Sequence, residues 1–83
     1  MTQEYRIARI SKIVSDRNYV VTHCREVVGA ITFSTCSNDN VWKEESAPAQ
    51  GAQVVLSDIR LMDGGWRAFS ARYLRPEDTL SSN

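Results

Sequence analysis

The residues that could hold a metal or attack a substrate are few and poorly spaced. The sequence has a single histidine, His23, directly before Cys24, and a second cysteine at Cys36. Structural zinc takes four ligands, usually in closely spaced pairs, whereas neighbouring residues of a strand point to opposite faces. One histidine without a recognisable carboxylate or hydroxyl partner does not make a catalytic constellation. We therefore predict no metal, no cofactor and no enzymatic activity.

Aromatic and cationic side chains are the better candidates for binding a ligand. Tyr19 can stack on a nucleobase, a contact worth about 1–3 kcal/mol. Arg9, Lys12 and Arg17 lie on or beside the same predicted hairpin and could contact a phosphate backbone. A second interpretation stays open for each: Tyr19 as a half-packed strand residue, and the cations as a charged edge that blocks aggregation between sheets.

The two tryptophans also have two interpretations. Trp66 follows two glycines, where a large ring can fold over the mouth of a barrel, and Trp42 lies in a long loop. A small barrel needs large side chains at its ends, so both could simply cap the core. We take Trp66, beside an exposed turn, as the candidate for ligand contact, together with the adjacent Arg67.

The charge distribution is uneven although the total is zero. The 83 residues carry ten basic and ten acidic side chains, which argues against binding by bulk electrostatics alone. Residues 1–37 hold five cations and three acids, residues 38–66 two and five, and residues 67–83 three and two. Eight of the ten cations are arginine, whose planar fork and stacking face suit recognition. A solvated, salt-bridged surface would explain the same distribution.

Local patterns predict that strands position these residues. Many β-branched residues alternate with turn-forming segments at 15–18 and 63–65. A helical turn within 41–45, capped by Asn40, is the helix that we expect, and residues 77–83 are expected to form a flexible tail. The predicted strands cover residues 5–14 (with a bulge), 19–24, 27–33, 53–61 and 66–74.

Five short antiparallel strands predict an all-β domain over residues 1–76 that closes into a barrel, because closure removes exposed edges. The longest loop, 34–50, lies between the third and fourth strands. The five-stranded oligonucleotide/oligosaccharide-binding (OB) barrel is the first candidate and an SH3-like barrel the second. The predicted core residues are Ile7, Ile10, Val20, Ile31, Val54, Leu56, Phe69 and Ala71.

The order of these pieces resembles a cold-shock domain over roughly residues 6–75. Segment 17–22 (Arg-Asn-Tyr-Val-Val-Thr) stands where that family has K-G-F-G-F-I, and segment 29–34 (Gly-Ala-Ile-Thr-Phe-Ser) where it has V-F-V-H-F-S. Segments 51–56 and 65–71 resemble its fourth-strand entry and its closing strand. Of the stacking aromatics in the first motif only Tyr19 remains, and Thr32 replaces a histidine in the second.

The resemblance implies an OB barrel that binds single-stranded RNA or DNA. The expected roles are stacking by Tyr19 with Phe33, and an edge contact by Thr32. Arg9, Lys12 and Arg17 would contact the backbone, with Trp66 and Arg67 as further contacts. The alternative is a protein-interaction or inhibitory module on the same barrel, favoured by the neutral charge, the thinned aromatic set and the acidic loop 39–45.

The same composition carries an expectation about location. No apolar run approaches the ~18–20 residues of a membrane-spanning helix, and the first residues lack the charged-then-apolar pattern of a secretory signal. We therefore expect a cytoplasmic protein with no membrane partner, and free thiols rather than a disulfide.

Overall fold

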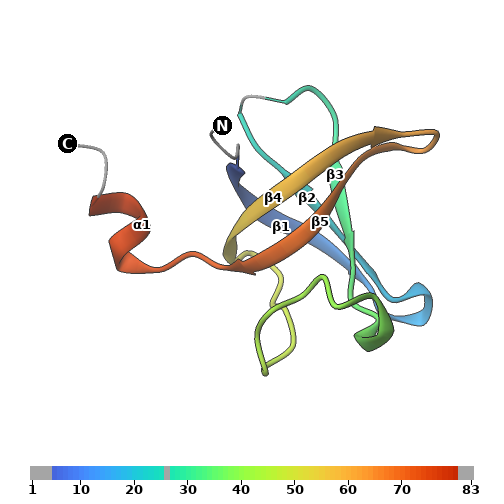
Figure 1. The fold of residues 1–83 in the computed structure, drawn as a ribbon, viewed down its shortest axis with the longest axis horizontal. Helices are drawn as coiled ribbons and strands as arrows, with labels where there is room; N and C mark the ends of the chain where they lie inside the picture. The colour runs from blue at the N-terminus through green and yellow to red at the C-terminus, as the bar shows by residue number, and fades with distance from the viewer. Residues whose placement is uncertain (1–4, 26, 81–83) are drawn as a thin grey trace.

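Five strands curl into a closed barrel (Figure 1). The structure is a computed structural model that describes residues 5–25 and 27–80. The strand order around the barrel is β1-β2-β3-β5-β4, consistent with the predicted OB-like all-β fold. The strands are β1 (Tyr5–Val14), β2 (Tyr19–His23), β3 (Ile31–Ser34), β4 (Gln53–Met62) and β5 (Gly65–Tyr73).

The first hairpin agrees with the sequence prediction. β1 and β2 pair antiparallel, with an irregularity between Ile10 and Lys12 that is the expected bulge. Residues Ser15–Arg17 form a 3-10 turn, η1, and Asn18 closes it in the left-handed region with φ 58°. Asparagine tolerates this conformation because its short side chain can bond to the local backbone. The turn-forming residues at 15–18 therefore predicted the position of this hairpin correctly.

The third strand is shorter than predicted, and its second neighbour runs parallel to it. Residues 27–30 lie outside β3, which begins at Ile31, and Gly29 takes φ 93° in the loop before it. β3 pairs with β5 in parallel through Ile31 with Trp66 and Thr32 with Arg67. The predicted antiparallel barrel is therefore mixed, because β3 and β5 run parallel.

The loop between β3 and β4 differs from the prediction. Its 3-10 turn, η2, spans Ser37–Asp39, and Asn40 ends it at φ 54° instead of capping a helix over 41–45. The next residues run beside β5: the Ala71 amide donates to the Val41 carbonyl at 3.0 Å, and the Lys43 amide donates to the Ala71 carbonyl at 2.9 Å. Because β3 is short, part of the edge of β5 has no strand beside it. Residues 41–43 form hydrogen bonds with that edge instead.

The predicted irregular tail begins with a helical turn, α1 (Pro76–Leu80). Proline is favoured at the first helical position, and the Asp78 carboxylate accepts a 2.7 Å hydrogen bond from the Arg75 amide that precedes the helix. Two further bonds of 2.9 Å join Asp78 to the Arg72 guanidinium. These bonds lower the pKa of Asp78 to about 2. The expectation for 81–83 lies outside the described residues.

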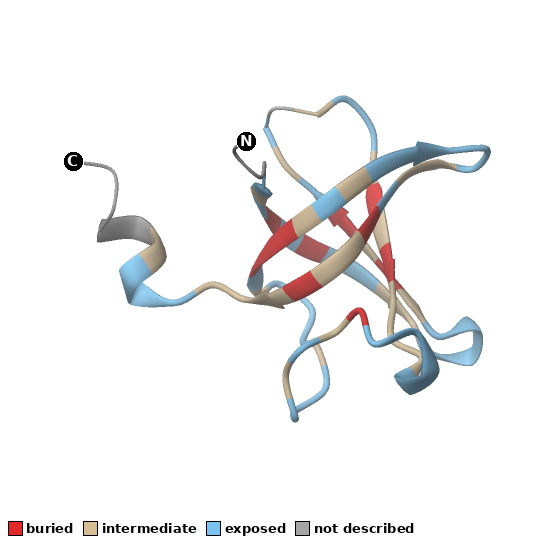
Figure 2. Ribbon diagram, viewed as in Figure 1, coloured by how far each residue is buried: buried red, intermediate tan, exposed pale blue. Residues whose placement is uncertain are grey.

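The core lies inside the barrel, as the burial pattern of Figure 2 shows. Two predicted core residues are wrong: Ile7 is 38% exposed and Phe69 is half-buried. Asp58 lies within the β4–β5 ladder, and its φ of 53° interrupts the alternation of inward and outward residues. As a result β5 buries Ala68 and Ala71, which are three residues apart, and Phe69 between them is only half-buried. The confirmed members are Ile10, Val20, Ile31, Val54, Leu56 and Ala71, joined by Ala8, Phe33, Val41 and Ala68.

No helix in the described part of the chain has the length and apolar character needed to cross a bilayer.

Candidate functional site

The outer face of the barrel over β1, β2, β3 and β5 is organised by strand register. Val20 and Thr22 are buried, so Tyr19 and Val21 lie on the outer face of β2. Val21 lies opposite Lys12 of β1 on one side and Thr32 of β3 on the other. Since Thr32 pairs with Arg67 of β5, one row crosses four strands. We call it the basic row, and it consists of Lys12, Val21, Thr32 and Arg67.

Tyr19 lies one pair further along the same face. Its cross-strand partners are Val14 of β1 and Ser34 of β3, and the residue is half-buried. The outward direction expected from strand alternation is confirmed. Tyr19 is therefore partly accessible on the face that carries the basic row.

The two ends of the basic row differ from its centre. Thr32 is half-buried, and its hydroxyl donates to the Trp66 carbonyl at 3.5 Å. Lys12 and Arg67 are exposed, and the side chain of neither makes a hydrogen bond or ion pair with another described residue. The row thus presents two available cations on either side of a hydroxyl.

Arg60 continues the row onto β4 opposite Arg67, but it is already engaged. Its guanidinium contacts both carboxylate oxygens of Asp58 at 3.0 and 3.1 Å and lies 4.6 Å from the centre of the Phe69 ring. The charge of Arg60 is therefore compensated in place, and we do not include it in the candidate site.

The structure removes Phe33 from the candidate site. Its side chain is fully buried, with 0% exposure, because Phe33 is the partner of buried Val20 on the inward face. The ring stacks on Trp42 with centroids 5.5 Å apart. Trp42 also meets Tyr73 edge-on at 4.9 Å and donates through Nε1 to the Ser46 carbonyl at 2.7 Å. These aromatics close one end of the barrel.

Trp66 lies on the opposite side of β5 from Arg67. It pairs with buried Ile31 and with Leu61, and its partly buried ring packs against the core. The structure thus places Trp66 where the core-capping interpretation expects it, away from the face that carries Tyr19.

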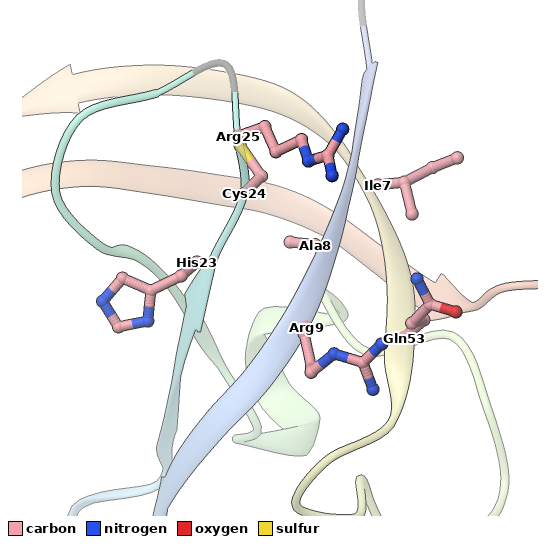
Figure 3. Close-up of a pocket in the computed structure, with 7 residues that line it drawn as sticks. All are labelled: Ile7, Ala8, Arg9, His23, Cys24, Arg25 and Gln53. Atoms are coloured by element: carbon pink, nitrogen blue, oxygen red, sulfur yellow. The ribbon is translucent and has the colours of Figure 1, made fainter.

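The remaining predicted cations lie at opposite ends of the first hairpin. Arg17 is exposed in η1, next to the start of β2. Arg9 lies opposite His23, in a pocket that is separate from the basic row (Figure 3). The pocket also contains Arg25, which sequence analysis did not select. Only its position just after the second strand could have pointed to it.

A second pocket of about 410 Å³ adjoins the basic row, where β3 and β5 diverge. Its polar residues include Arg67, Ser34 and Asp39, and the Ser34 hydroxyl donates to the Asp39 carboxylate at 2.5 Å. Phe69 contributes apolar surface. Sequence analysis missed this pocket because Asp39 and Arg67 are distant in the chain.

The acidic loop is partly neutralised within the protein. The Glu44 carboxylate accepts a 3.1 Å hydrogen bond from the Tyr73 amide and lies 3.7 Å from the Arg75 guanidinium.

Among residues 5–25 and 27–80, no three His, Cys, Asp or Glu side chains gather in a group that could hold a metal ion. Cys24 and Cys36 are both free thiols.

The resemblance to a cold-shock domain stays a prediction on the motifs alone. The barrel agrees with it, but burial of Phe33 removes one of its two stacking positions. No family model matches the sequence, and no curated protein or solved structure matches it either.

Proposed function

We propose that this protein binds single-stranded RNA or DNA across the outer face of β1, β2, β3 and β5. The observation that carries the proposal is the register that aligns Lys12, Thr32 and Arg67 in one row beside Tyr19. In OB barrels the face formed by strands two and three is where oligonucleotides bind. Here this face combines an aromatic ring, a hydroxyl and available cations.

Each residue type has a distinct role on this face. Tyr19 stacks on a base, and such stacking is tolerant of sequence because every base has a π face. Lys12, Arg17 and Arg67 neutralise phosphates. The Thr32 hydroxyl, which donates to Trp66, keeps oxygen lone pairs that can accept a hydrogen bond from a base amino group.

The dimensions suit a short strand. The basic row crosses three strand spacings of about 4.7–4.9 Å each, so its cations stand roughly 14 Å apart. A strand lying along the row would contact a few nucleotides, at the lower end of the roughly 4–16 nucleotides that OB folds cover.

The test is fluorescence anisotropy with labelled octathymidylate and octauridylate at about 50 and about 200 mM salt. With three phosphate contacts, log K should fall with log salt at a slope of about −2, since single strands contribute about 0.7 per contact. A folded protein that binds neither probe at the lower salt concentration would contradict the proposal.

A second candidate function, protein interaction, rests on the tip of the β4–β5 hairpin. Leu61 is 67% exposed and Met62 46% exposed, and Leu61 pairs with Trp66. This apolar tip extends the inward face of the hairpin into solvent. Lack of oligonucleotide binding, together with a specific co-purifying protein that Leu61→Ser releases, would favour this function.

A further inference from the structure

A pocket of about 550 Å³ lies over β1, between the end of β2 and the start of β4 (Figure 3). It holds two arginines, Arg9 and Arg25, and none of the described residues that line it carries a carboxylate. Such a pocket attracts an anion. The lining residues are Ile7, Ala8, Arg9, His23, Cys24, Arg25 and Gln53.

Arg9 is held in place by the backbone of the neighbouring loop. One terminal nitrogen of its guanidinium donates to the Gly51 carbonyl at 2.7 Å. The loop itself is tied to β1, because the Gly51 amide donates to the Ile10 carbonyl at 2.8 Å and the Ile10 amide donates to the Ala52 carbonyl at 2.9 Å. A guanidinium has five N–H donors, so this anchored group keeps others for a ligand.

Arg25 supplies the second charge from another element. It follows β2 and extends toward β1, whereas Arg9 points toward Gln53 and His23 points away from both (Figure 3). Arg25 is exposed and makes no hydrogen bond or ion pair with any other described residue. Two guanidinium groups therefore border the pocket, one held by Gly51 and one without a partner among the described residues.

We infer that this pocket binds the terminal phosphate of a nucleic-acid strand, an inference that rests on the proposed function. A phosphate monoester carries a charge of about −1.5 to −2 near neutral pH, whereas each internal phosphodiester carries a single charge. Two arginines match the monoester in charge, and the planar fork of a guanidinium can bind two oxygens of a phosphate group. The Gln53 amide can donate an additional hydrogen bond.

The experiment compares octathymidylates that are identical except for a 5′-phosphate, a 3′-phosphate or no terminal phosphate. One of the phosphorylated strands should bind on the order of tenfold more tightly than the unphosphorylated strand. Its terminal phosphate accepts charge-assisted hydrogen bonds from the arginines, which are about twice as strong as the neutral ones open to a terminal hydroxyl. Arg25→Ala should abolish this ratio and leave binding of the unphosphorylated strand unchanged. Arg17→Ala, which lies outside the pocket, should weaken all three strands and keep the ratio.

Thermal melting followed by circular dichroism establishes that the variants are folded, and Arg25→Gln replaces the alanine variant if that one is not. A second measurement follows the backbone amides of Cys24, Arg25 and Gln53 by NMR during titration with inorganic phosphate, with chloride as the control. Chemical-shift changes caused by phosphate but not by chloride support anion binding in the pocket. If these changes occur and no oligonucleotide binds, the proposed function is wrong but the anion site is supported. Equal affinity for all three oligonucleotides overturns the inference and leaves the proposed function intact.

Discussion

The barrel carries two sets of cations that differ in their partners. On β4, at the end of β5 and in the segment before α1, three arginines are compensated by acids: Arg60 by Asp58, Arg72 by Asp78 and Arg75 by Glu44. Elsewhere on the outer face and in the loops beside it, the side chains of four cations make no hydrogen bond or ion pair with another described residue. We call these the open cations, and they are Lys12, Arg17, Arg25 and Arg67.

The difference shows how a chain without net charge can present a cationic surface. The acids that bring the total to zero include Asp58, Asp78 and Glu44, which are occupied by the paired arginines. Asp39, which lines the pocket beside Arg67, accepts a hydrogen bond from the Ser34 hydroxyl. Net charge therefore says little about what one face of the molecule attracts.

The largest expected effect tests the barrel that holds both sets of cations. Ile31 is fully buried and belongs to the short parallel contact with β5, so Ile31→Ala should lower the free energy of unfolding by about 2–5 kcal/mol. Urea denaturation measures this loss. The control is Val28→Ala, because Val28 is 97% exposed and should cost less than about 0.5 kcal/mol. A similar denaturation midpoint for both variants would contradict the packing described for β3.

The next largest effect separates stacking from charge on the outer face. Tyr19→Ala should weaken octathymidylate binding by about 1–3 kcal/mol, the range found for base–aromatic stacking, and leave the salt slope unchanged. Tyr19→Phe, which keeps the ring, should bind nearly as well as the parent. Anisotropy titrations at two salt concentrations measure both quantities. Full affinity in a folded Tyr19→Ala protein would show that the bases stack elsewhere.

A smaller effect distinguishes an open cation from a paired one. Arg67→Ala should reduce the salt slope by about 0.7, the contribution of one phosphate contact with a single strand. Arg60→Ala is the matched control on the neighbouring strand, and its slope should stay at the parent value because Asp58 already compensates Arg60. Equal changes in the two variants would remove the distinction between the two sets.

The smallest effect concerns the paired set and is confined to the C-terminal turn. Hydrogen bonds from Arg72 and from the Arg75 amide lower the pKa of Asp78 from 3.8 to about 2. A carboxyl group whose pKa is lower in the folded protein than in the unfolded chain stabilises the fold at pH values above its unfolded pKa. This stabilisation is lost as the pH falls through the pKa of the folded protein. The protection factor of the Asp78 amide, which donates to the Arg75 carbonyl at 2.9 Å, should therefore be constant above about pH 4 and fall between about pH 4 and 2.

Two observations check that assignment. Asp78→Asn should leave the backbone amide of residue 78 weakly protected at every pH, because the uncharged side chain cannot form the ion pair with Arg72. Exchange in β1 and β2 should be unaffected by the substitution. A turn that stays protected at pH 2 in the parent protein would show that other contacts hold it.

The elements that could be predicted from sequence are those whose signals are local. The bulged first strand, the turn that Asn18 closes, the fourth strand and the turn at Asp63 and Gly64 all agree with the structure. Each depends on β-branched residues or on backbone conformations that few residue types tolerate. The outward direction of Tyr19 could also be predicted from the sequence, because the alternation of side chains is a property of a single strand.

The structure alone decided the features that depend on contacts between distant segments. Phe33 is not one of them, because alternation from the predicted core residue Ile31 already indicates its inward face, and only the family motif placed it among ligand contacts. The α1 turn depends on Asp78 meeting Arg72, and residues 41–43 are extended because β5 offers them an edge.

The sequence by itself therefore determined the strands, the turns and which residues are able to stack or carry charge. Only the tertiary structure decided which of these residues share a surface. The parallel contact of β3 with β5 brings Arg67 beside Thr32, and the pairing of acids with the other arginines leaves the open cations available. The physical reason is that propensity and alternation act over a few residues, whereas barrel closure and charge pairing join residues far apart in the chain.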